Sequence, residues 1–123
     1  MQLRPTSLKP DRERKPYFDG GDTENANYRF TCAVCKAKMA IPFSLVHHGA
    51  WGWRNAFSEA DVREIDGFFG LKPGRQVPPT PWPSISSIEC SSCKTKHVFF
   101  ATYDEYRNSV FRLVAQGLAY SDA

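Results

Sequence analysis

The sequence contains no long hydrophobic run. Apolar residues make up 41% of the chain, but no stretch approaches the roughly 20 consecutive residues that a transmembrane helix needs. The opening residues, Met1 to Pro5, do not form the apolar segment of a secretory signal peptide. These absences predict a soluble cytoplasmic protein that does not associate with a membrane.

Catalytic signatures are also missing. The chain has no Gly-rich phosphate loop, no nucleophile elbow, no His-Glu-x-x-His motif and no nucleotide-binding fingerprint. The adjacent His47 and His48 have no carboxylate at a spacing that would complete a metal site, so we interpret them as solvated or core-capping residues. The sequence therefore predicts a protein that is not an enzyme and that has no small-molecule substrate.

Excess charge is absent from most of the chain. The formal net charge is +3, and residues 1–16 carry all of it, with five basic against two acidic residues. The other residues include eleven of each sign, and four thiolates around one Zn²⁺ would make this body slightly acidic. Such a body lacks the broad positive field that draws proteins to phosphate backbones.

Cysteine is scarce, but all four cysteines fall into one repeated pattern. The two copies are Cys32-Ala33-Val34-Cys35-Lys36-Ala37-Lys38 and Cys90-Ser91-Ser92-Cys93-Lys94-Thr95-Lys96. Two residues between thiols let a tight turn aim both sulfurs at one point, and two such turns supply a closed tetrahedral zinc site. We therefore predict one structural Zn²⁺ bound by Cys32, Cys35, Cys90 and Cys93. An iron centre of the rubredoxin type would use the same thiolates, whereas two disulfides would suit a secreted chain.

The two turns resemble the zinc knuckles of the zinc-ribbon group, in which hairpin turns clasp one zinc ion between two β-elements. The resemblance covers the two motifs and their immediate flanks. It departs from the usual pattern at one position, because the residue after the second cysteine of a knuckle is often Gly and here it is Lys36 or Lys94. Lysine at positive φ is uncommon, so either the turn differs or the metal holds it.

The predicted fold class is α+β: a small zinc-stapled domain of two zinc-knuckle β-hairpins, one short helix and a Pro-rich crossover. Residues 1–27 are predicted to be a flexible basic and polar arm, and residues 28–123 the zinc-ribbon-like domain. Ser58 is a typical N-cap for an amphipathic helix that ends near Gly70. The preceding stretch, Ser44 to Phe57, mixes glycines with large aromatic residues and is interpreted as a loop over an apolar surface.

Two later segments complete the expected fold. Gly70 to Ser84 contains five of the nine prolines and predicts an extended, stiff crossover. Asp104 to Gly117 is interpreted as part of a β-hairpin with a bulge near Gly117, because β-branched and aromatic residues are frequent there. A helix also fits this stretch, since apolar residues recur three or four apart.

Two non-enzymatic functions fit these observations. The first is a protein–protein interaction module of the adaptor, inhibitor or toxin-immunity type, in which Trp82 between Pro81 and Pro83 is a rigid anchor. The second is a nucleic-acid-binding zinc ribbon that uses the basic arm and the lysines of the motifs, with weak affinity. The near-neutral body favours the first. The predicted partner-binding residues are Trp82, Trp51, Trp53, Lys36, Lys38, Lys94 and Lys96.

Overall fold

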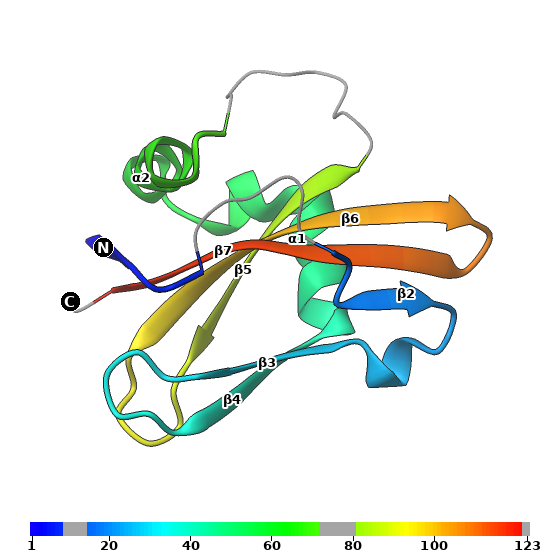
Figure 1. The fold of residues 1–123 in the computed structure, drawn as a ribbon. Coiled ribbons are helices and arrows are strands. Elements are labelled where there is room, and N and C mark those ends of the chain that lie inside the picture. The colour runs from blue at the N-terminus through cyan, green and yellow to red at the C-terminus, as the bar shows by residue number, and fades with distance from the viewer. Residues whose placement is uncertain (9–14, 72–80, 122–123) are drawn as a thin grey trace.

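The fold is built around one antiparallel sheet, seen in a computed structural model that describes residues 1–8, 15–71 and 81–121 (Figure 1). The strands run in the order β1-β7-β6-β5, and β2 also pairs with β7. Their bounds are Leu3–Pro5 for β1, Phe18–Gly20 for β2, Trp82–Glu89 for β5, Lys96–Arg107 for β6 and Val110–Ser121 for β7. The mixed α+β class is confirmed, with two α-helices in the described residues where the sequence predicts one.

A second, two-stranded sheet packs on one face of the main sheet. It consists of β3 (Asn27–Thr31) and β4 (Lys38–Pro42), which are antiparallel and lie below the main sheet in Figure 1. Its inward side chains, including Tyr28 and Ile41, join a core with Phe99 of β6. The opposite face carries a second core that includes Phe100, the next residue along β6, because successive strand residues point to opposite faces.

The hairpin prediction for the last part of the chain is confirmed. Strands β6 and β7 pair from Lys96↔Ser121 to Arg107↔Val110, and the helical alternative is wrong. The ladder shifts register between Phe100 and Ala101, directly opposite the Gly117 region where the bulge is predicted. Most of the Pro-rich crossover, residues 72–80, lies outside the described residues.

The predicted helix after Ser58 is present as α2 (Glu59–Phe69). The Ser58 side chain accepts a hydrogen bond from the Asp61 N–H, and Gly70 ends the helix in the left-handed conformation with φ 69°. A half-buried ion pair ties α2 to the preceding helix, because Arg54 donates to both carboxylate oxygens of Asp66 at 2.7 and 2.8 Å. None of the helices in the described ranges is long and apolar enough to cross a bilayer.

The loop predicted for Ser44 to Phe57 is wrong, because this stretch forms helix α1 (Phe43–Ala56). The helix lies along the outer edge of β5, where it is held by side-chain hydrogen bonds. The Ser84 hydroxyl donates to the Val46 carbonyl at 2.6 Å, and the Ser86 hydroxyl donates to the carbonyl of Leu45 at 3.0 Å. Tertiary contacts with the edge strand therefore outweigh the low helix propensity of the glycines and aromatic residues.

Close approach of α1 to β5 explains one of its glycines. A Cβ placed on Gly49 would lie 2.3 Å from the Ile85 carbonyl oxygen, far inside normal contact distance. Beyond this point the helix contains non-helical backbone at Gly52, and Trp53 then turns into the second core. Gly49, which looks like a loop residue in the sequence, is therefore the position that fits this helix against the strand.

Two described segments of residues 1–27, the predicted arm, pair with the main sheet. Strand β1 pairs with the end of β7 through Leu3↔Ser121, and β2 pairs with an earlier part through Phe18↔Leu113. Without β1 and β2, β7 would be an edge strand whose outer N–H and C=O groups have no partner. Short segments can pair with these groups through their own backbone, so they need no hydrophobic pattern in their sequence. Residues 9–14, the most charged part of the predicted arm, lie outside the described residues.

Candidate metal centre

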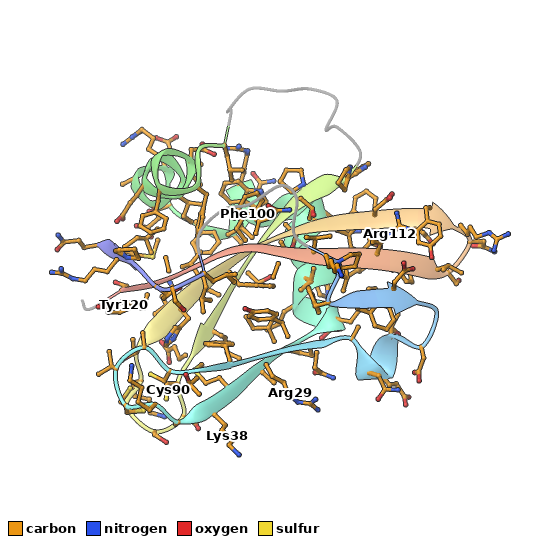
Figure 2. All side chains as sticks on the ribbon, in the orientation of Figure 1. Arg29, Lys38, Cys90, Phe100, Arg112 and Tyr120 are labelled. Carbon is orange, nitrogen blue, oxygen red and sulfur yellow. The ribbon has the colours of Figure 1, made fainter. Side chains whose placement is uncertain are left out.

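The four cysteines come together where two turns meet at one end of the molecule. Cys32 and Cys35 lie in the turn from β3 to β4, and Cys90 and Cys93 lie in the turn from β5 to β6 (Figures 1 and 2). All four Sγ atoms lie within 4.8 Å of one another. The Cys32 and Cys93 sulfurs are 3.6 Å apart, and those of Cys35 and Cys90 are 3.5 Å apart.

The same local geometry forms both turns. In the first, the Cys32 N–H donates to the Ala37 carbonyl at 2.8 Å and the Lys36 N–H donates to the Cys32 carbonyl at 3.1 Å. The second repeats this pattern from Cys90 to Thr95 at 2.9 Å and from Lys94 back to Cys90 at 2.8 Å. Equivalent residues thus make equivalent hydrogen bonds.

The lysine after each pair adopts the backbone conformation that usually selects glycine. The φ angle is 66° at Lys36 and 65° at Lys94, in the left-handed region. Both turns therefore need a conformation that glycine adopts most readily, and the lysines carry its modest strain. Both copies therefore form the same turn, with the same φ at the lysine and the same backbone hydrogen bonds.

The sulfur positions fit a tetrahedral metal site. Zinc–sulfur bonds of about 2.3 Å place neighbouring sulfurs of a tetrahedron about 3.8 Å apart, close to the distances found here. A disulfide would bring two sulfurs to about 2.05 Å, and all four cysteines are free thiols. The donor set therefore suits a metal that prefers thiolate ligands, such as zinc. The four cysteines brought together are the four predicted as ligands.

Hydrogen bonds favour the thiolate form at two of the four cysteines. The Thr95 hydroxyl, 3.0 Å from Cys93 Sγ, and then the Thr95 N–H lower the pKa of the Cys93 thiol to about 6. Backbone N–H groups of Cys93 and then of Ser92 lower the pKa of Cys90. Thiolates are the form that binds metal, so both shifts favour the ligand state at neutral pH. At Cys35 a lowering hydrogen bond from the Ala37 backbone is outweighed by the Cys90 sulfur, burial and the other sulfurs, which together raise its pKa to about 12. Cys32 and Cys90 are fully buried, whereas Cys35 and Cys93 reach the surface.

No known protein-family model, curated protein or solved structure matches this chain. The function of the site therefore has to follow from its own residues. These are four convergent thiols, two equivalent turns and the side chains around them.

His97 is a part of the site that the sequence did not reveal. It follows Lys96 at the start of β6, and its side chain is fully buried. Its Nε2 accepts the Ala33 N–H at 3.1 Å, and its Nδ1 lies 3.2 Å from the Thr95 carbonyl. A comparison of the two repeats would have singled out this position, because the first copy has Met39 where the second has a polar histidine.

The four lysines of the motifs separate into two groups. Lys36, Lys38 and Lys94 are exposed at the metal end, and the Lys36 ammonium donates to the Ala33 carbonyl at 3.3 Å. Figure 2 shows Lys38 pointing outward from the hairpin near Cys90. Lys96 is half-buried and lies over the Phe57 ring instead, 5.5 Å from its centroid.

The three tryptophans predicted to bind a partner are also not equivalent. Trp53 is only 6% exposed and belongs to the second core, so it is not available for a partner. Trp51 is 57% exposed, and its ring rests edge-on against the half-buried Trp82, with ring centroids 4.5 Å apart.

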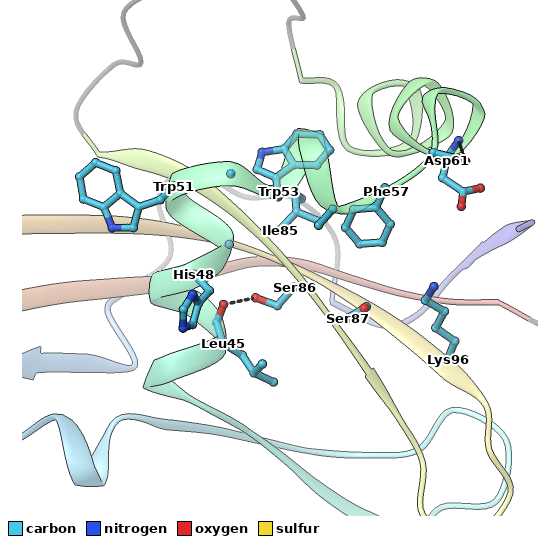
Figure 3. A pocket seen from close by; sticks show the side chains of 14 residues that line it. Leu45, His48, Trp51, Trp53, Phe57, Asp61, Ile85, Ser86, Ser87 and Lys96 are labelled. Atoms are coloured by element: carbon cyan, nitrogen blue, oxygen red, sulfur yellow. Dashed lines mark hydrogen bonds between the residues drawn. The ribbon is translucent and has the colours of Figure 1, made fainter.

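A groove of about 610 Å³ runs beside Trp51, between α1, the start of α2 and β5 (Figure 3). Both apolar side chains, such as Leu45 and Ile85, and polar ones, such as Lys96 and Asp61, line it. The side chains that define it include Leu45, Trp51, Trp53, Phe57, Ile85 and Lys96.

Proposed function

We propose that this chain is a non-enzymatic zinc protein in which one Zn²⁺ joins two zinc-knuckle hairpins, as in zinc ribbons, and an aromatic surface docks another protein. The four-sulfur cluster supports the metal assignment. A zinc ion with four cysteine ligands has no open position for water or substrate, so the metal is architectural. A reducing compartment such as the cytoplasm would keep the four thiols free for it.

The observation that carries the docking proposal is Trp51. It is the most exposed large apolar side chain among the described residues, and it is backed by other rings. Trp82 lies 4.5 Å and Tyr103 6.5 Å away, each meeting the Trp51 ring edge-on. A ring held in place by its neighbours loses little conformational entropy when a partner covers it, which is typical of interface anchors. This role moves the predicted anchor from Trp82 to Trp51, with Trp82 as its support.

A second candidate, nucleic-acid binding, is favoured by one observation. Lys36, Lys38 and Lys94 are exposed at the metal end and Arg29 is exposed on β3, which leads to it, and none of the four forms an ion pair within the described residues. Four phosphate contacts give only weak binding, of roughly 10⁻⁴–10⁻⁶ M at physiological salt. The exposed aromatic side chain that base stacking needs is Trp51 or Tyr106, neither of which lies on the metal-bearing turns. We therefore place this candidate second.

The test compares two substitutions of equally exposed apolar residues. Trp51→Ala removes the proposed anchor, and Val34→Ala removes the Val34 side chain, which is 55% exposed on the first cysteine turn. Proteins that bind the zinc-loaded wild type in cell extracts are identified by cross-linking, and their affinity for each purified variant is measured. We expect Trp51→Ala to lose at least tenfold, a typical hot-spot effect of about 1.4 kcal/mol or more, and Val34→Ala to bind as wild type.

Two outcomes contradict the proposal. Equal affinity of Trp51→Ala and wild type for every captured protein would remove the docking role. Sequence-selective RNA or DNA binding that is abolished by replacing Lys36, Lys38 and Lys94 with Ala would promote the second candidate. Elemental analysis provides an independent check of the metal, for which we expect one zinc per chain.

A further inference from the structure

His97 connects the two cysteine turns through its imidazole ring. One ring nitrogen, Nε2, accepts the N–H of Ala33, which lies between Cys32 and Cys35. The other nitrogen faces the Thr95 carbonyl, which also accepts the Cys90 N–H at 2.9 Å. A single side chain therefore bridges backbone atoms of both halves of the metal site.

The two contacts require one protonation state of the ring. An acceptor Nε2 carries no proton, so the proton of a neutral imidazole lies on Nδ1, where it donates to the Thr95 carbonyl. A charged ring would set an N–H against the Ala33 N–H and lose the bridge. The ring is fully buried and packs against Phe30 at 5.3 Å between centroids, so no water replaces these partners.

The bridge is present in only one of the two repeats. Met39 is the counterpart of His97, and Ala37 is the counterpart of Thr95. The first turn therefore has neither a side chain that reaches across nor a hydroxyl beside its second thiol. This asymmetry makes Met39 a natural control position for the role of His97.

We infer that His97 is a positioning residue that holds the two cysteine pairs together and so raises the affinity of the site for its metal. Cys35 and Cys90 are separated by 54 residues, and closing a loop of that length costs conformational entropy. When the protein itself holds the pairs together, the metal does not have to supply this ordering, and its apparent affinity rises with the population of the closed site.

The test measures Zn²⁺ affinity by competition with a chromophoric chelator. His97→Leu puts an apolar side chain of similar size in the same place and removes both hydrogen bonds, and we expect it to weaken binding about 10–100-fold. His97→Gln keeps a donor and an acceptor on one planar group and should recover most of this loss. Met39→Leu, at the equivalent position, should bind as tightly as the wild type. The Co²⁺ absorption spectrum should stay that of four thiolates in all three.

General destabilisation is separated from loss of the bridge by a fourth variant. Gly49→Ala disturbs the contact of α1 with β5 and leaves the cysteine turns unchanged. Its loss of unfolding free energy and its loss of Zn²⁺ affinity, measured together, show how far a weaker fold alone lowers the affinity. We expect His97→Leu to lose more affinity than that calibration gives. An equal loss, a loss in His97→Gln as large as in His97→Leu, or wild-type affinity in His97→Leu would overturn the inference.

Nitrogen NMR of the wild-type imidazole gives a check that needs no variant to fold. The zinc-loaded protein should show a neutral His97 ring protonated on Nδ1. A ring protonated on Nε2 would be incompatible with the Ala33 contact and would refute the bridge, whatever the variants do.

Discussion

Gly49→Ala should destabilise the protein, although the same exchange in a helix normally stabilises it. The new Cβ would lie 2.3 Å from the Ile85 carbonyl oxygen and 2.7 Å from Ser84 Oγ. Ile85 belongs to β5, which is hydrogen-bonded along its length to β6, so the carbonyl cannot move without disturbing the sheet. The helix therefore has to shift outward, away from the strand edge that it covers.

The size of the effect follows from two opposing terms. Overpacking of this kind costs about 1–3 kcal/mol, and weakening the hydrogen bond from Ser84 to Val46 adds up to about 1 kcal/mol. Replacing glycine with alanine in a helix returns about 0.5–1 kcal/mol. The middle of these ranges gives an expected net loss of about 2 kcal/mol in the free energy of unfolding.

Gly67→Ala is the matched control. Gly67 lies inside α2, and a Cβ placed there meets no atom within 4 Å. Only the propensity term remains, so this variant should gain about 0.5–1 kcal/mol.

Urea unfolding followed by circular dichroism, with free zinc held constant, measures both variants on one scale. Each kcal/mol should move the melting temperature by about 3–5 °C for a chain of this size. The reasoning is refuted if Gly49→Ala is as stable as the wild type, or if the two variants change stability in the same direction.

Two further predictions concern the metal and alkaline pH. Cys90→Ser should give an unfolded or protease-sensitive protein, because structural zinc contributes on the order of 10 kcal/mol, comparable to the whole stability of a domain. An unchanged melting temperature would show that the site is peripheral. Burial, and then the nearby Tyr28, raises the pKa of Tyr17 well above its usual value near 10, and its hydroxyl has no hydrogen-bond partner among the described residues. A raised pKa contributes stability that is complete below pH 10 and is lost as the pH rises further, so Tyr17→Phe should be at least as stable at neutral pH and lose less stability between pH 10 and 11. In urea unfolding, Tyr17→Phe should still lose some stability as the pH rises, because burial also raises the pKa of Tyr103 to about 12. If the unfolding free energies of the variant and the wild type fall equally with pH, Tyr17 has no such role.

Features of this protein that depend on neighbouring residues could be predicted from the sequence. The ligand set follows from two Cys-x-x-Cys spacings, and α2 follows from Ser58 and Gly70 at its ends. Each signal lies within a few residues and has a direct chemical meaning, whether two thiols on one turn or a hydroxyl that caps a helix.

Features that depend on distant contacts could not be predicted. Helix α1 forms because Gly49 fits against a strand 36 positions away at Ile85, a contact that no local propensity contains. Trp53 is buried because the helix changes direction at Gly52. Likewise, His97 gains its role only when the Ala33 turn, 64 residues earlier, folds against it.

The position of β7 at the end of the described chain imposes an order on folding during synthesis. This strand pairs with β1, β2 and β6, all of which leave the ribosome before it does. The stretch from Cys93 to Ser121 takes on the order of seconds to translate at about 5–20 residues per second. During that interval all four thiols have been made, while the first two strands still have no strand to join. All four thiols precede β7 in the chain, so a metal bound by them would join the two cysteine turns before β1 and β2 have a strand to pair with.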